Sequence, residues 1–321
     1  MTYVNRKGFT LVELMVVMTI LGVVVVGVLG LVTRQNKAYH SEEAIIDMQM
    51  NNRVALDRIV YLIRMAGFGC QANISNGVNG FTSVINATNS NSAPDSLTLV
   101  SGLRKVGIVD NDNDPTNGSF SKTTTTVIPV KMDGSLTFTD YFNDSNKRYF
   151  YISPAISKGF LTVASGGVDD THKKLTKNGA SITIREGNNV YAVRAYTLAI
   201  NSGNVTINEN TGGGNQIYVE NIEDLQFQYG WDQNGDGQFD PNSEWADDPS
   251  GNEDQVRAVK VYLLARSGQP DRDFIDLHDD DAATAGKQYT IADHTITLNS
   301  SSEHFHHYLA EATVLIRNLN F

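Results

Sequence analysis

The strongest constraint on this chain is an apolar run near its N-terminus. Residues 9–33 read FTLVELMVVMTILGVVVVGVLGLVT and contain one charged side chain, Glu13. As an α-helix, this run would extend about 37 Å, and the hydrocarbon core of a bilayer is about 30 Å thick. A secretory signal peptide has a shorter apolar region followed by an A-x-A-like site, and this sequence has neither. We therefore predict a retained transmembrane helix over residues 9–33.

The charges that flank this helix indicate its orientation only weakly. Arg6 and Lys7 precede it, whereas Arg34 and Lys37 follow it. Positive charge is retained preferentially on the cytoplasmic side, although a long domain can be translocated despite its charges. We predict a single-pass inner-membrane protein with a cytoplasmic N-terminus and an exported C-terminal domain.

Glu13 is the residue in the apolar run that requires an explanation. A carboxylate at the centre of a membrane helix costs on the order of 2.5–3.5 kcal/mol by insertion scales. It therefore either lies near the interface, where the side chain reaches water, or has a partner. The sequence around it, Arg6-Lys7-Gly8-Phe9-Thr-Leu-Val-Glu13, resembles the prepilin leader site of the type IV pilin superfamily.

This resemblance implies a processing step and an assembly role. Residues 1–8 would be a leader peptide, which prepilin peptidase removes between Gly8 and Phe9, and the new N-terminal residue would be methylated. Glu13 would then meet the N-terminal amine of a neighbouring subunit in a filament. Two charges that are costly in hydrocarbon compensate each other only when they are paired in the correct register.

Residues 34–66 are predicted to continue the helix as an amphipathic stem. Apolar residues recur there at steps of three and four, which marks one face of a helix, with Asn52 interrupting the stripe. Gly67 and Gly69 then provide a stop signal. The apolar face must be covered, most simply by the chain's own head. The stripe consists of Ile45, Met48, Leu56, Ile59 and Ile63.

Residues 67–321 are predicted to form an exported β-rich head. Short β-rich runs alternate there with polar Asn, Ser and Gly segments, so the fold class is α+β, with one long helix packed on a mainly antiparallel sheet. Residues 71–94 and 105–123 are expected to be long insertions. The predicted strands are 96–100, 124–130, 160–164, 181–184, 190–200, 216–218, 225–229, 256–265, 288–291, 294–298 and 312–317.

Several segments of the stem and head are similar to the PilW family of minor pilins. The resemblance rests on residues 52–58, 63–70, 219–230, 256–267 and 315–319. It implies a subunit that joins other minor pilins and the major pilin in a complex that initiates pilus assembly and sits at the tip, with a large tip adhesin as a further partner. Family members often carry more cysteines, but Cys70 is the only cysteine here, so no intramolecular disulfide can form.

Two other functions remain open at this point. Minor pseudopilins of type II secretion systems share the same architecture. Alternatively, the long head loops would form an adhesion module at the pilus tip. An exported enzyme on a pilin stem is the weakest reading, because the sequence has no nucleophile elbow, phosphate loop or supported Cys–His pair. A net charge of −11 also disfavours nucleic-acid binding, which requires a basic surface.

An acidic segment at residues 232–254 contains a cation-loop motif. Asp232-Gln-Asn234-Gly-Asp236-Gly-Gln238-Phe-Asp240 follows the D-x-[DN]-x-[DN]-G pattern of calcium loops. Oxygen ligands would come from the four Asp and Asn side chains and from the backbone carbonyl of Gln238. Ser243 stands where an EF-hand has its last glutamate, so we predict an isolated structural Ca²⁺ site. Glu244, Asp247 or Asp248 would complete the shell; the alternative is an acidic turn without metal.

Two further groups have a weaker metal-binding pattern. Asp110, Asp112 and Asp114 alternate with asparagines but lack the glycine and the distal acid of a calcium loop. His304, His306 and His307 cluster with Glu303, and a strand would place His304 and His306 on one face, as a transition-metal site requires. The simpler interpretation is that these histidines are partly exposed strand positions.

Overall fold

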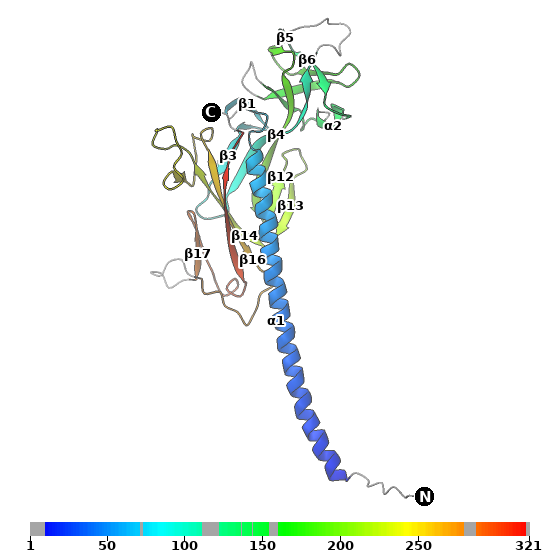
Figure 1. The fold of residues 1–321 in the computed structure, drawn as a ribbon, viewed down its shortest axis with the longest axis vertical. Helices are drawn as coiled ribbons and strands as arrows, with labels where there is room; N and C mark the ends of the chain where they lie inside the picture. The colour runs from blue at the N-terminus through cyan, green and yellow to red at the C-terminus, as the bar shows by residue number, and fades with distance from the viewer. Residues whose placement is uncertain are drawn as a thin grey trace, which may run out of the picture. The chain divides into compact units, whose positions relative to one another are not determined.

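The computed structural model describes residues 10–70, 73–110, 122–135, 137–142, 144–153, 160–278 and 287–318. The chain divides into two compact units, residues 1–47 and residues 48–321. A single helix, α1 (Leu11–Met65), contributes to both units (Figure 1).

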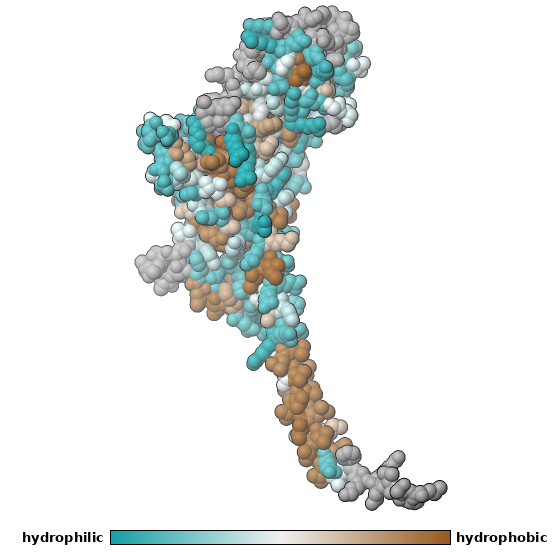
Figure 2. All heavy atoms as spheres, viewed as in Figure 1, coloured by the Kyte–Doolittle hydropathy of each residue, from teal (hydrophilic) through white to brown (hydrophobic). Residues whose placement is uncertain are grey.

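The described part of the first unit is the N-terminal part of α1, most of which is apolar. Its side chains from Leu11 to Val32 are exposed, with exposed fractions of 74% and 45% at these two positions. Figure 2 shows this part of the helix as an almost continuous apolar surface. Among the described residues, α1 is the one helix whose length and composition allow it to cross a membrane. An apolar surface of this kind requires lipid or other protein around it.

In the second unit, the upper part of α1 packs one face against the head. Ala55, Ile59 and Ile63 are completely buried on that face. Asn52 is also completely buried, and its Nδ2 donates hydrogen bonds to the carbonyl oxygens of Leu263 at 3.3 Å and Tyr308 at 2.9 Å. The polar break in the apolar stripe is therefore a link between the helix and the backbone of two strands.

The larger sheet of the head has nine strands, and all of its pairings are antiparallel. Strand β11 pairs with β4 in addition to its neighbours β12 and β7. In spatial order the strands are β13 (Asn215–Glu220), β12 (Asn204–Asn208), β11 (Asn189–Asn201), β7 (Tyr149–Ser153), β8 (Leu161–Asp169), β9 (Lys174–Lys177), β6 (Val127–Met132), β4 (Ser96–Val109) and β3 (Ile85–Thr88).

A second, four-stranded antiparallel sheet carries most of the C-terminal part of the head. Its order is β15 (Trp245–Ala246), β14 (Ile222–Gly230), β16 (Ala258–Arg266) and β19 (His307–Leu315). The remaining elements are the two-stranded pairs β1 (Asn73–Val78) with β2 (Phe81–Ser83), β5 (Lys122–Thr125) with β10 (Ile182–Arg185) and β17 (Gln288–Ile291) with β18 (His294–Thr297), and the short helix α2 (Thr139–Phe142).

Asp95, just before β4, connects the two sheets. Its backbone N–H donates to the Leu225 carbonyl at 2.8 Å, and its carboxylate accepts the backbone N–H of Phe227 at 3.0 Å. The segment before β4 thus runs along the edge of β14. Burial, together with the nearby charges of Asp293 and Asp224, raises the pKa of Asp95 to about 7, although hydrogen bonds from backbone amides lower it.

The structure confirms the predicted fold class, a long N-terminal helix with an antiparallel β-rich head. The predicted insertion at residues 71–94 is wrong in part, because residues 73–88 contain β1, β2 and β3. The insertion at 105–123 is also shorter than predicted: residues 105–109 extend β4, and residues 111–121 lie outside the described part. Strands β7, β9 and β12 were not predicted, since each has only four or five residues, too few for a clear periodic pattern.

The end of α1 depends on a glycine with unusual backbone geometry. Gly69 has a φ of +70°, and a Cβ added to it would lie 2.7 Å from the Tyr191 ring. Cys70 follows directly; its Sγ donates to the Phe68 carbonyl at 3.2 Å. The residue is partly exposed, but protein surrounds the sulfur, and this desolvation raises the pKa of the thiol to about 12.

We predict that Gly69→Ala destabilises the head by about 1–3 kcal/mol. Alanine is strained in the left-handed backbone conformation, and its Cβ must also displace the Tyr191 ring. The free energy of unfolding would be measured on the full chain in detergent by urea titration, with tryptophan fluorescence as the signal. Gly213→Ala is the matched control, since its added Cβ meets open space. Equal stability of the two variants would contradict this account of the helix end.

Candidate functional site

The N-terminus of α1 is built around Glu13. Glu13 Oε2 accepts the backbone N–H and the hydroxyl of Thr10, both at 2.9 Å, and the Thr10 hydroxyl oxygen accepts the N–H of Glu13 at 3.3 Å. This reciprocal pair is a capping box, which satisfies backbone donors at the start of a helix. The predicted cleavage residues, Gly8 and Phe9, lie outside the described residues.

The acidic loop folds through hydrogen bonds from backbone amides to its own carboxylates. Asp232 accepts the N–H groups of Gly235, Asp236 and Gly237 at distances of 2.6–3.2 Å. Asn234 Oδ1 accepts the N–H of Asp236 at 2.8 Å, and Asp236 Oδ1 accepts that of Gln238 at 2.8 Å. The predicted ligands therefore lie in one loop, and their oxygens point toward its backbone.

Glu244 organises this loop from within. Its side chain is buried, Oε1 accepts the N–H groups of Gln233 and Asn234, both at 3.1 Å, and Oε2 accepts that of Asp240 at 2.7 Å. The sequence identified Glu244 only as a possible metal ligand. Its position eleven residues after Gln233 gives no signal for this bracing role, which depends on the loop closing.

The other acids considered for metal binding have separate partners. Asp247 Oδ1 accepts from Gln228 Nε2 at 2.8 Å, and Asp248 Oδ1 accepts from Ser250. Asp110 forms an ion pair with Lys131 at 3.9 Å, whereas Asp112 and Asp114 lie outside the described residues. Across the described ranges, no group of three or more His, Cys, Asp or Glu side chains is arranged to hold a metal ion.

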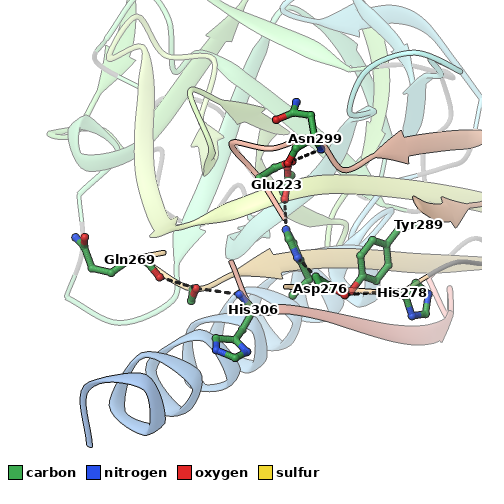
Figure 3. Close-up of polar contacts among 10 residues, drawn as sticks. Glu223, Gln269, Asp276, His278, Tyr289, Asn299 and His306 are labelled. Carbon is green, nitrogen blue, oxygen red and sulfur yellow. Dashed lines mark hydrogen bonds and ion pairs between the residues drawn. The ribbon is translucent and has the colours of Figure 1, made fainter. Parts of the chain in front are cut away.

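His307 forms the centre of a buried polar network, and Figure 3 labels its neighbours Glu223, Asp276 and Tyr289. Its imidazole is completely buried between two carboxylates: Nδ1 lies 2.7 Å from Asp276 Oδ2, and Nε2 lies 2.8 Å from Glu223 Oε2. The Tyr289 hydroxyl donates to the same Asp276 oxygen at 2.8 Å, and the backbone N–H of His278 donates to Oδ1. Because a carboxylate accepts from each ring nitrogen, both nitrogens carry protons and the ring is an imidazolium.

The charges in this network reinforce one another. Burial by itself lowers the pKa of His307, but the hydrogen bonds and charges of Glu223 and Asp276 outweigh it, and the pKa lies above its ordinary value. Burial likewise raises the pKa of Asp276, but its bonds from His278, Tyr289 and His307 outweigh this and leave the pKa below the usual range. The network therefore links four parts of the head, which contribute Glu223 from β14, Asp276 from the segment that ends at residue 278, Tyr289 from β17 and His307 from β19.

The predicted grouping of His304 and His306 on one strand face is wrong. Strand β19 starts only at His307, and residues 301–304 form a turn. His304 Nδ1 donates to the Phe274 carbonyl at 2.6 Å, and the His306 ring stacks on Phe274 with centroids 3.8 Å apart. The three histidines thus have different partners and do not form a common metal site.

Comparison with protein families gives two matches. Residues 183–318 match the family Type IV Pilus-assembly protein W, and residues 4–29 match the Prokaryotic N-terminal methylation motif. Over residues 183–318 the chain is similar to the PilW family, and its N-terminal segment carries the methylation motif. The family match covers β14, β17 and β19, the strands that hold the His307 network.

The other comparisons add little to this assignment. The type IV-like pilin TTHA1219 from Thermus thermophilus is similar over 86% of this chain and 97% of that one, with 12% sequence identity and a TM-score of 0.34. A likeness this weak carries no argument about function. No curated protein sequence matches the chain.

We predict that His307→Gln lowers the free energy of unfolding of this protein by about 3 kcal/mol at pH 6, because the buried Asp276 and the partly buried Glu223 lose their shared cation. When the pKa of a histidine is higher in the folded than in the unfolded protein, its protonation stabilises the folded state. This contribution is complete below the unfolded pKa of about 6.5, and it disappears as the pH rises through the folded pKa. The deficit relative to the unchanged protein should therefore shrink at pH 9. Urea unfolding of the full chain in detergent measures both values.

A matched control for this prediction is His172→Gln. His172 pairs with Asp169 at 2.8 Å, but the two side chains are 57% and 41% exposed. An exposed pair contributes about 0–1 kcal/mol, so this variant should change stability little at either pH. A deficit at His307 that stays constant from pH 6 to pH 9 would show that the imidazolium is not the stabilising form.

Proposed function

We propose that this PilW-type minor pilin takes part in initiating type IV pilus assembly and belongs to the tip complex of the pilus. The observation that carries the proposal is the combination of a methylation motif at residues 4–29, a helix long enough to span a membrane, and a PilW match in the head. Prepilin peptidase would cut between Gly8 and Phe9. The protein would act through assembly, and we assign it no reaction.

The proposed location follows from the same features. Before assembly, the chain would sit in the inner membrane as a single-pass protein with a cytoplasmic N-terminus and its head on the outside. After processing it would enter a filament with other minor pilins and the major pilin, with a large tip adhesin as a further partner. The net charge of −11 gives no support for nucleic acid as a ligand.

Glu13 would have two consecutive partners in this proposal. Before assembly its carboxylate caps the first turn of α1 through Thr10. Cleavage after Gly8 would create a free amine at Phe9, four residues before Glu13. In a filament, the amine of a neighbouring subunit would pair with Glu13, and in hydrocarbon this pairing would favour one register over all others.

Two alternatives share the architecture of a pilin-like head on a membrane helix. As a minor pseudopilin, the protein would serve type II secretion and not a pilus. As an adhesion module, it would use the long loops of the head to contact surfaces at the tip. A pilus role is favoured over both because the matched family is a pilus-assembly family.

Deletion of the gene and complementation with variants test the proposal. We expect the deletion strain to lose its pili and the unchanged gene to restore them. Glu13→Gln should be processed after Gly8, but its amount in sheared pili should fall at least tenfold, because an amide cannot neutralise the amine. Glu43→Gln is the matched control, since its side chain lies on the same helix and is 73% exposed.

Each other result identifies an alternative. Normal pili with failed adhesion would favour the adhesion module, and failed secretion of folded proteins would favour the pseudopilin. N-terminal sequencing of the assembled chain gives an independent check. If residues 1–8 remained on protein in normal filaments, the processing proposal would be wrong.

We also propose that the acidic loop binds one structural Ca²⁺ ion. Support comes from the spacing of Asp232, Asn234 and Asp236, which gives three side-chain oxygens with Gly237 at a φ of +87°. Binding would require these oxygens to turn from the loop amides toward the ion, with the Gln238 carbonyl and Asp240 as further ligands and Glu244 bracing the loop. Calcium takes six to eight oxygen ligands, so water would supply the rest.

Calorimetry on the full chain in detergent tests the calcium proposal. Titration with CaCl₂ should give one site with Kd on the order of 10⁻⁴–10⁻³ M, as in extracellular calcium modules. Combining Asp232→Asn with Asp236→Asn should abolish the signal, whereas Asp254→Asn, in the same acidic segment but outside the motif, should leave it unchanged. The absence of calcium uptake at millimolar concentration in the unchanged protein would end the proposal.

A further inference from the structure

The upper part of α1 and strand β13 leave an apolar surface uncovered in the second unit. Four of its side chains come from α1 and two from β13. Tyr61 is 52% exposed, Tyr218 44% and Ile217 60%. Exposed apolar side chains that gather in one patch mark an interaction site more often than scattered ones do. We call this surface the stem patch; it consists of Met50, Val54, Arg58, Tyr61, Ile217 and Tyr218.

Arg58 joins the helix and strand parts of the stem patch. Its guanidinium carbon lies 5.4 Å from the centre of the Tyr61 ring and 5.9 Å from that of the Tyr218 ring. Figure 1 shows β12 and β13 beside α1, in agreement with these contacts. Met50, Val54 and Arg58 are spaced four residues apart, which places them on one helix face. The patch is therefore continuous from α1 to β13.

The α1 part of the patch lies in a positively charged stretch of a negatively charged protein. Residues 53–64 contain Arg53, Arg58 and Arg64 with one acid, Asp57, whereas the whole chain has a net charge of −11. None of the three guanidinium groups forms an ion pair with another described residue. An arginine held between aromatic rings is well suited to receive a carboxylate, with its planar donors already oriented.

The complementary pattern occurs lower on the same helix. Glu42, Glu43, Ile46 and Asp47 are all exposed, and residues 42–47 contain no basic side chain. Consider a neighbouring subunit whose stem has the same pattern and lies parallel to α1 but displaced along it. Its carboxylates would reach Arg58, and its aliphatic side chains would reach Tyr61 and Tyr218. Charge complementarity of this kind fixes the register of an interface more than its strength.

We propose that the stem patch is the docking surface for the acidic stem segment of an adjacent pilin-like subunit. The inference deepens the proposed function, on which it rests, by naming the surface and the chemistry of the partner. Arg58 is the central contact: a carboxylate of the neighbour binds its guanidinium, and Tyr61 and Tyr218 cover the pair from water. Buried arginine and tyrosine are the residues that most often dominate such interfaces.

Photo-crosslinking in living cells tests this surface on the full-length protein. p-Benzoylphenylalanine would replace Tyr61 or Tyr218, and in a separate strain Tyr308 of β19, which is 43% exposed and serves as the matched control. We expect adducts from positions 61 and 218 but not 308. Mass spectrometry should place them on the stem of a protein with an N-terminal methylation motif, between its membrane helix and its head.

Charge reversal then tests Arg58 itself. Arg58→Glu should lower the adduct yield from position 218 at least fivefold, whereas Arg185→Glu, an exposed arginine on β10, should leave it unchanged. Limited proteolysis of both variants checks that the head remains folded. Adducts that persist in Arg58→Glu, adducts to a head strand or to a protein without the motif, or no protein adduct at all would overturn the proposal.

These results are separable from a failure of the proposed function. If the deletion strain loses its pili but Arg58→Glu restores them with unchanged adducts, the stem patch is not the docking surface and the assembly role stands. If deletion leaves pili intact, the proposed function itself fails, whatever the adducts are.

Discussion

The architecture depends on one helix, α1, whose two parts have different surroundings. In the second unit, α1 buries Ala55, Ile59 and Ile63 completely against the head, and Asn52 bonds to the backbone of two strands. In the first unit, the same helix exposes apolar side chains from Leu11 to Val32. Without these two hydrogen bonds a buried amide at position 52 would be costly, so the position of Asn52 marks the part of the helix that packs on the head.

The head achieves its cohesion without a disulfide. A single cysteine rules out an internal cross-link, and residues distant in sequence are joined instead by buried charges and hydrogen bonds. Asp95 attaches the start of β4 to β14, and His307 connects Glu223 with Asp276. Such pairs often contribute little net stability compared with apolar packing, but breaking one is expensive, so they favour one arrangement of the chain.

The class of the fold was easier to predict from the sequence than the contacts between residues that are distant in the chain. The α+β class followed from the periodicity of the stem and the short β-rich runs, and β17 occupies the predicted residues 288–291. The capping box was visible as Thr10-x-x-Glu13, although the resemblance to a leader site drew attention only to the charge. The pairing of His307 with Glu223 spans 84 residues, and no local pattern encodes such a contact. Likewise, the partners of Asn52 lie more than 200 residues away.

The environment of Cys70 has a practical consequence. A thiol whose pKa is about 12 is almost entirely protonated at neutral pH, and the thiolate is the form that reacts with alkylating reagents and disulfides. A cysteine introduced on the surface would ionise near its ordinary value of about 8.5 and react far faster. The native residue can therefore stay in place while a fluorophore or spin label is attached at a single chosen position, which leaves the end of α1 undisturbed in measurements of distance or motion.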